Sequence, residues 1–184
     1  PVPSSAASDV YKRQLLDSPN AADANFIGIA AFNSYRVEAG YMIPGTDFAV
    51  HGHGEGEWRT PYDMGLGWLV KLERDDDFVG KAALAKIKKA GPTYDYVSVE
   101  INEELEVESV DGAKLYSTDG DEIGVIFAGA FSMELGKFIG LCNVSSGLVS
   151  DGTEVKAGDE KWDAVIRNTP LWSTEARTQT PPAT

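Results

Sequence analysis

The pattern of apolar and polar residues changes once along the chain, near Pro92. Before that point apolar or small residues recur every third or fourth position, most clearly between Phe26 and Val37. Gly40 then stands where the C-terminal cap of a helix belongs. The spacing therefore predicts a helix from about Ile29 to Ala39.

Two further elements are expected before the change of pattern. The apolar segment from Leu66 to Leu72 predicts a short strand, and Asp77 stands where an N-cap would start a helix from Phe78 to about Ala90. Lysines gather in the last turns of this helix, where positive charge suits the helix dipole, and Gly91 with Pro92 would end it. The stretch between the two helices is rich in glycine and proline and predicts a long loop.

After Pro92 the period becomes alternating, which is typical of half-buried strands. Turn sequences such as TDGDE, ELGK and SDGTE separate the candidates. Six strands are predicted, at 94–101, 113–118, 122–131, 137–144, 153–157 and 162–167. Short strands at this spacing favour a small antiparallel barrel or sandwich, so the fold class is α+β.

The first residues are expected to lie outside the fold. The stretch SSAASDVYKRQ is small and polar, has no apolar period, and resembles the translation of a transposase adapter used to prepare DNA sequencing libraries. We therefore expect residues 1–14 to be an artefact and the native protein to continue upstream of Leu15. A native disordered leader is the alternative; a secretion signal would need an apolar run that is not found before Phe26. The remaining divisions are a mixed part, 15–92, an all-β part, 93–172, and a polar tail, 173–184.

Composition excludes some classes of function. The formal net charge is −13 over 184 residues, which disfavours a nucleic-acid or anionic-membrane surface because such surfaces need clustered Lys and Arg. No apolar run approaches the roughly 20 residues needed to cross a bilayer. The single cysteine, Cys142, lies in an apolar run and is expected to be a small buried residue. A chain with one cysteine cannot form an internal disulfide, which is consistent with a reducing cytoplasm.

Arg36 and Glu38 are the charged residues most in need of explanation. They are two residues apart in a predicted helix, so they point to different faces and each needs its own partner. Glu38 either lies in solvent or pairs with a residue of the strand segment, or it accepts hydrogen bonds from the donors of a flat polar heteroaromatic ligand.

Other candidate sites are weaker. The loop HGHGEGE, 51–57, offers two imidazoles and two acids, but a flexible glycine-rich loop is a poor scaffold for four ligands and the chain has no further His, so no metal site is predicted. No serine stands in a strained strand-to-helix turn beside a histidine and an acid, and no glycine-rich nucleotide fingerprint is present. The residues alone name no catalytic group.

Six strings in order carry a family resemblance: NSYRVEAGY, GTDF, TPYDMGLGWLVKL, DFVGKAAL, DGDEIGVIFAGAFSMELGKFIGLCNV and GTEVKA. Together they resemble successive landmarks of the glycine cleavage T-protein (aminomethyltransferase) family, from about Phe26 to Trp172. The resemblance implies the end of a folate-binding α+β domain followed by a small antiparallel β-barrel, with tetrahydrofolate as cofactor.

The resemblance also implies two binding residues. Glu38, in YRVEAG, falls on the family's folate-binding glutamate, which would bind and orient the N–H groups of the pterin ring. Arg74, just after GWLVKLE, is the nearest match to a second folate position, although its spacing to the following DF differs from the family pattern. A guanidinium suits the carboxylates of the benzoyl-glutamate end; the alternative is an exposed Arg balanced by the three aspartates at 75–77.

The activity implied is transfer of a one-carbon unit from an amine or methyl donor to N5 of folate. The family's catalytic aspartate belongs to an N-terminal half that has no counterpart here, so no catalytic residue is assigned and the chain alone is expected to be inactive. The polar tail departs from the family's usual ending, so neither the donor nor a lipoylated carrier protein as partner is fixed. Two alternatives remain open: the folate module of a flavin-dependent dimethylglycine or sarcosine dehydrogenase, and a folate-binding protein without transferase activity.

Overall fold

The computed structural model describes residues 4–19, 27–49 and 58–171. Helix α1 (Ser4–Leu16) comes first, followed by α2 (Ile29–Glu38), a single 3-10 turn η2 (Gly67–Leu69) and α3 (Lys81–Ala90). Six strands follow: β1 (Tyr94–Ile101), β2 (Lys114–Tyr116), β3 (Glu122–Ser132), β4 (Lys137–Ser145), β5 (Glu154–Ala157) and β6 (Trp162–Arg167). The change from helices to strands therefore falls at Pro92, where the sequence predicts it.

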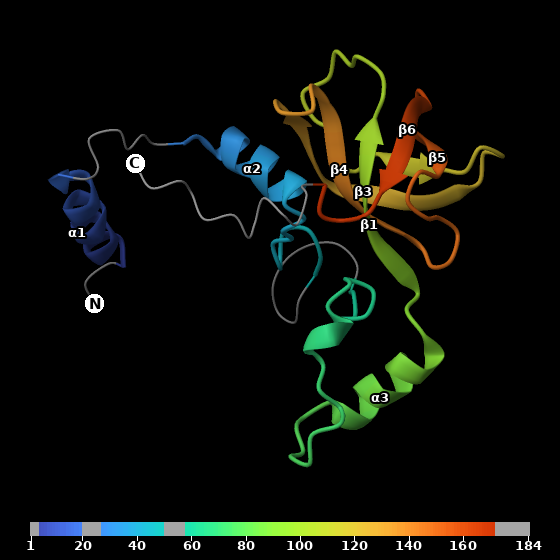
Figure 1. Ribbon diagram of the computed structural model, residues 1–184, viewed down its shortest axis with the longest axis horizontal. Coiled ribbons are helices and arrows are strands. Elements are labelled where there is room, and N and C mark those ends of the chain that lie inside the picture. The colour runs from blue at the N-terminus through green and yellow to red at the C-terminus, as the bar shows by residue number, and fades with distance from the viewer. Residues whose placement is uncertain (1–3, 20–26, 50–57, 172–184) are drawn as a thin grey trace, which may run out of the picture.

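The strands form a closed antiparallel barrel in the order β1, β4, β3, β2, β5, β6, which Figure 1 shows at the upper right. Closure comes from β6, which pairs with β1 through Ser98 opposite Arg167 and Ile101 opposite Ala164. All six strands occur where the alternating pattern predicts them, and the choice between barrel and sandwich is decided by this last pairing. The fold class is α+β, as expected.

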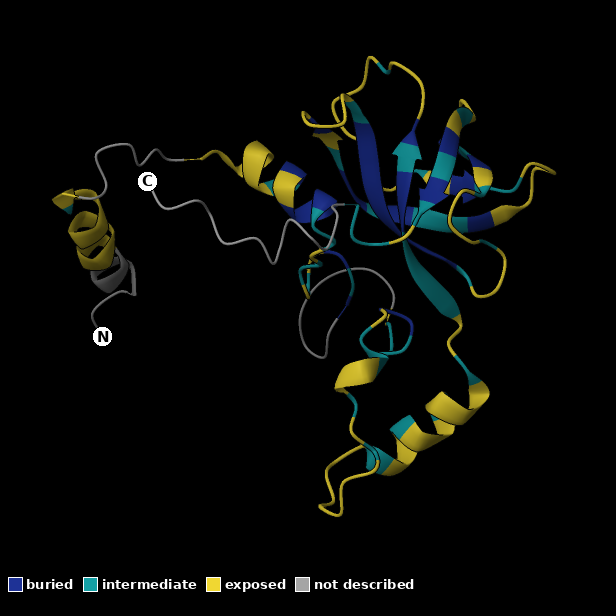
Figure 2. Ribbon diagram, viewed as in Figure 1, coloured by how far each residue is buried: buried dark blue, intermediate teal, exposed yellow. Residues whose placement is uncertain are grey.

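Strand β4 explains how the helical part attaches to the barrel. Its middle is a continuous apolar run that is buried throughout, which is the pattern of a strand covered on both faces. Phe138, Cys142 and Val144 face the barrel interior, whereas Ile139 and Leu141 pack outside it with Val37 of α2. Figure 2 shows the corresponding burial: most of β4 and the C-terminal end of α2 are dark blue. The end of α2 is thus held against the outer wall of the barrel.

Cys142 behaves as the sequence predicts. It is fully buried, and burial raises the pKa of its thiol above the usual range, which keeps it protonated. Its Sγ donates to the carbonyl of Val97 at 3.3 Å. The residue is a core component and shows no feature of a reactive thiol.

Two local predictions before Pro92 are wrong. Leu66–Leu72 is not a strand, because the backbone N–H of Leu66 donates to Pro61 and that of Val70 to Gly67, which folds the segment into tight turns around η2. Asp77 does not cap α3, which begins only at Lys81; Gly80 has φ 93°, and this left-handed residue separates Asp77 from the helix. The C-terminal end of α3 at Ala90 and Gly91 agrees with the sequence.

Helix α1 was not expected from its sequence. Residues 9–17 are all exposed, so the described part of α1 contributes no side chain to a core. Figure 1 shows α1 apart from the barrel. The side chains at 9–17 therefore build no core, although the segment is helical. No helix among the described residues is both long and apolar enough to cross a membrane.

Asp63 joins the turn at 60–66 to the start of the barrel. Its Oδ2 accepts the backbone N–H of Thr60 at 2.9 Å and the hydroxyl of Thr60 at 2.6 Å, while Oδ1 accepts the N–H groups of Thr93 and Tyr94 at 2.7 and 3.2 Å. Burial by itself would raise the pKa of this carboxyl, but the four hydrogen bonds favour the charged form and the net pKa lies below its usual 3.8.

We expect the stability contributed by Asp63 to disappear in acid. Because the folded pKa is lowered, the stabilisation is present above the unfolded value and is lost as pH falls below about 4. Asp63→Asn should lower the unfolding free energy by about 1–3 kcal/mol at pH 7, and the gap between variant and wild type should narrow toward pH 2.5. Urea titrations at pH 7, 5 and 2.5 measure this, with Asp119→Asn, at an exposed position, as control. A difference in unfolding free energy between Asp63→Asn and wild type that does not change with pH would contradict the prediction.

Candidate functional site

Glu38 ends helix α2 on the face that the barrel covers. Ser34, Val37 and Glu38 are buried there, and only 1% of Glu38 is exposed. Oε1 of its carboxylate accepts a hydrogen bond from Oγ of Ser132, at the end of β3, at a distance of 2.5 Å. The sequence alone could not show this contact, because the two residues are 94 positions apart.

The second carboxylate oxygen of Glu38 has no hydrogen-bond partner among the residues that the structure describes. Oε2 is buried, and a buried polar atom left without a partner costs about 1–3 kcal/mol, more when it carries charge. Native structures rarely keep such an atom without a role. The interpretation that places Glu38 in solvent is therefore wrong, and Oε2 is a buried acceptor without a partner among the described residues.

Arg36 has its own partner, as the two-residue spacing predicts. Its Nη1 and Nη2 atoms contact Oδ2 and Oδ1 of Asp47 at 2.7 and 3.1 Å, a bidentate ion pair in which the side chains are 8% and 1% exposed. Asp47 also accepts the N–H of Ile43 at 2.7 Å. The GTDF string contains Asp47, but only the structure shows that this acid, and not Glu38, neutralises Arg36.

The same cluster ties α2 to the barrel. Nε of Arg36 donates to Oδ1 of Asn33 at 2.7 Å, and Nδ2 of Asn33 donates to the carbonyl of Gly129 in β3 at 3.0 Å. From β1, the hydroxyl of Tyr96 donates to the carbonyl of Gly40 at 2.9 Å. Both ends of the turn that carries Glu38 are thus fixed to strands, and the carboxylate is held in one place.

Arg74 lies elsewhere. The segment 73–80 is exposed, and Figure 2 shows it between η2 and α3, away from α2. Nη2 of Arg74 contacts Oδ2 of Asp76 at 3.0 Å, with 64% of each side chain exposed. This matches the interpretation in which neighbouring aspartates balance the arginine. The structure does not bring Arg74 and Glu38 together.

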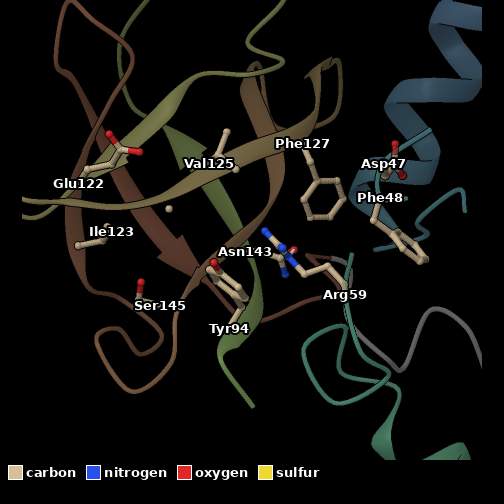
Figure 3. Close-up of a pocket in the computed structure, with 11 residues that line it drawn as sticks. Asp47, Phe48, Arg59, Tyr94, Glu122, Ile123, Val125, Phe127, Asn143 and Ser145 are labelled. Carbon is tan, nitrogen blue, oxygen red and sulfur yellow. Dashed lines mark hydrogen bonds between the residues drawn. The ribbon is translucent and has the colours of Figure 1, made fainter. Parts of the chain in front are cut away.

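A cavity of about 420 Å³ lies beside the barrel, against the start of β1, the first half of β3 and the end of β4. Figure 3 shows Arg59, Tyr94, Phe127 and Asn143 around it. The guanidinium carbon of Arg59 is 4.0 Å from the centroid of the Tyr94 ring, and its Nε donates to Oδ1 of Asn143 at 3.0 Å. Sequence reasoning missed Arg59, whose position before Thr60 and Pro61 carries no separate signal.

The second cavity, of about 400 Å³, begins at the two residues that follow Glu38. Tyr41 and Trp68 line it with exposed rings, and Tyr96 lines it from β1. Burial, and then the charge of Asp47, raise the pKa of the Tyr96 hydroxyl above its usual range, so it stays protonated and donates to Gly40. Neither Glu38 nor Arg74 lines either cavity.

The histidine-rich stretch 51–57 lies outside the described residues, so the structure adds nothing to the interpretation of that loop. Among the residues that are described, no group of three or more His, Cys, Asp or Glu is arranged to hold a metal ion. The chemistry that the geometry offers is therefore hydrogen bonding by a buried carboxylate.

The chain is similar to known aminomethyltransferases over most of its length. No protein-family model matches the chain. It is 33% identical over 152 residues to an aminomethyltransferase of Herpetosiphon aurantiacus, covering 83% of this chain and 37% of the relative. It is 31% identical over 163 residues to a probable aminomethyltransferase of Haloarcula marismortui, covering 89% of this chain and 40% of the relative. The chain thus spans well under half the length of these curated relatives.

A solved structure shares the fold. The glycine cleavage system aminomethyltransferase T of Bartonella henselae matches with a TM-score of 0.75 and 23% sequence identity. The match covers 91% of this chain and 44% of that chain. At this identity the likeness establishes the arrangement of the helices and the six-stranded barrel, and nothing about ligands.

Proposed function

Because the chain belongs to the glycine cleavage T-protein (aminomethyltransferase) family, we propose that it forms part of a tetrahydrofolate site in which Glu38 binds the pteridine ring. The observation that carries the proposal is the buried Oε2 atom of Glu38, which has no partner in the described part of the chain. The pteridine presents adjacent N–H donors, and a fixed carboxylate oxygen is a matched acceptor for them.

The side chains around Glu38 fit the cofactor in chemistry and hold the carboxylate in place, although Glu38 lines neither of the two cavities. The ion pair of Arg36 with Asp47 and the contact of Asn33 with Gly129 hold the end of α2, so the carboxylate is preorganised. When bound, tetrahydrofolate supplies the N5 nitrogen that accepts a one-carbon unit. Glu38 binds and orients the ring.

Arg74 belongs to the same proposal as the residue for the benzoyl-glutamate end of the ligand. Its ion pair with Asp76 is exposed, and exposed ion pairs are worth at most about 1 kcal/mol, so a ligand carboxylate can displace Asp76 at little cost. The bidentate guanidinium geometry suits that carboxylate.

The activity of the longer protein is part of the proposal too. We infer one-carbon transfer from an amine or methyl donor to tetrahydrofolate, since the relatives are named aminomethyltransferases. A lipoylated protein that carries the donor is the partner this would involve, as the solved relative is a component of the glycine cleavage system.

The expected result of Glu38→Ala is tetrahydrofolate binding weakened by about 1–3 kcal/mol, because ligand donors lose their acceptor. The measurement is anaerobic calorimetric titration of the chain and of a full-length chimera, in which this chain replaces the region it matches in the Herpetosiphon aurantiacus relative. Glu104→Ala, which removes an exposed carboxylate, is the matched control. Affinity equal to wild type in both forms would remove Glu38 from the site.

Arg74→Met tests the benzoyl-glutamate end of the ligand separately from the pteridine end. We expect it to weaken the binding of tetrahydrofolate by about 0.5–1.5 kcal/mol and to leave the binding of tetrahydropterin, which has no glutamate, unchanged. Glu38→Ala should weaken both. The same titrations, repeated with both ligands, measure this; equal effects of Arg74→Met on the two ligands would contradict the assignment of Arg74.

A further inference from the structure

A barrel hydroxyl group orients the carboxylate of Glu38. Ser132 has no exposed surface, and its Oγ lies between two polar groups. The backbone N–H of Leu135 donates to that Oγ at 3.0 Å, and Oγ lies 2.5 Å from Oε1 of Glu38. Since the N–H of Leu135 occupies an acceptor position of the hydroxyl, the hydroxyl proton is directed to the carboxylate. The result is a chain of two hydrogen bonds from the β3–β4 turn to Glu38, in which each bond strengthens the other.

Ser34 is the other hydroxyl near this carboxylate, and it does not do the same work. Its Oγ lies 2.9 Å from the carbonyl of Phe131 and 3.4 Å from Oε1 of Glu38. A serine hydroxyl has one proton, and the shorter contact takes it. Ser34 therefore ties α2 to β3, and Ser132 is the principal donor to Glu38 among the described residues.

The two oxygens of Glu38 are thereby made different. Oε1 is engaged by Ser132, whereas Oε2 is buried without a partner in the described part of the chain. With one oxygen fixed, the side chain is held in a single rotamer and the free lone pairs of the other oxygen point in a set direction. A ligand that binds such a carboxylate loses less free energy to side-chain ordering.

We propose that Ser132 is a positioning residue for the pteridine-binding carboxylate. The barrel then contributes a residue that supports the ligand site. The inference rests on the proposed function of Glu38. Ser132 acts through Glu38 and does not touch the ligand: it fixes Oε1 and thereby leaves Oε2 for the adjacent N–H donors of a reduced pteridine.

The test is a double-mutant cycle on affinity. Ser132→Ala in the chimera should weaken tetrahydrofolate binding about tenfold, the effect of losing a hydrogen bond to a charged group. In the Glu38→Gln background the same substitution should change affinity less than about twofold, because the group through which Ser132 acts is gone. Ser34→Ala also removes a buried serine hydroxyl and, as the matched control, should leave affinity within about twofold of wild type while lowering stability.

Each outcome bears on the proposal. The positioning role is overturned if Ser132→Ala leaves the affinity for tetrahydrofolate unchanged. It is also overturned if Ser132→Ala weakens binding equally in wild type and in the Glu38→Gln background. In both cases the folate proposal stands. No binding by the wild-type chimera, or no effect of Glu38→Ala, overturns both. If circular dichroism shows Ser132→Ala unfolded, Ser132→Cys replaces it, because a thiol of similar size is a weak donor and should give a smaller loss in the same direction.

Discussion

Replacing Arg36 by Met is expected to lower the free energy of unfolding by about 3–5 kcal/mol, the largest effect that we predict for a side chain near the site. The Asp47 side chain is 1% exposed. After the substitution, the N–H of Ile43 is the hydrogen-bond donor left to its carboxylate among the residues that the structure describes. An uncompensated buried charge is far more costly than the loss of the ion pair itself. Urea denaturation followed by tryptophan fluorescence measures the change.

Two controls separate the buried charge from a general effect of losing an arginine. Arg74→Met breaks the exposed pair with Asp76 and should cost less than about 1 kcal/mol. The double variant Arg36→Met, Asp47→Leu removes both charges and should recover most of the lost stability. A double variant as unstable as Arg36→Met would show that the ion pair is not the cause.

The second large effect is expected from Gly124→Ala in β3. A Cβ at Gly124 would lie 2.3 Å from the carbonyl oxygen of Asn143 and 2.9 Å from Cα of Val144. Both atoms belong to the backbone of β4, to which β3 is paired with Gly124 opposite Val144, so no side-chain rotation relieves the contact. The strands must separate locally, and we expect a loss of about 3 kcal/mol or more.

Gly28→Ala is the matched control for this prediction. No atom lies within 4 Å of the added Cβ there, so the change should stay within about 1 kcal/mol. Denaturation in urea compares the two variants, and the one-dimensional proton spectrum reports whether the barrel remains folded. Equal stability of Gly124→Ala and wild type would mean that β3 and β4 are farther apart in solution than in the structure.

Helix α2, the six strands and the end of α3 were predictable because they depend on neighbours in the sequence. Tyr94–Ile101 and Trp162–Arg167 form strands where the alternation predicts them, and Ala90 and Gly91 end α3 where the lysines and the following proline indicate. The failures are also local in origin. Leu66–Leu72 is apolar enough for a strand, but its backbone forms η2 and the turns beside it. Gly80 separates Asp77 from the helix that Asp77 was predicted to cap.

The candidate site was predictable only in part. The position of Glu38 within YRVEAG pointed to a special carboxylate, and the two-residue spacing from Arg36 correctly required separate partners. The identities of those partners, Asp47 and Ser132, were not predictable, because hydrogen bonds between distant segments leave no local pattern.

By itself the sequence determined the six strands, helix α2, the end of α3, the family and the residue on which the folate proposal rests. Local periodicity, turn residues and motif order are properties of neighbouring positions, so they can be recognised in the sequence alone. Only the tertiary structure decided that β6 closes the barrel on β1 and that α2 packs against the outer face of β3 and β4. It also decided that Ser132 engages one oxygen of Glu38, while the other has no partner among the described residues. These are contacts between positions far apart in the chain, whose geometry is set by packing and by the need to satisfy buried polar groups.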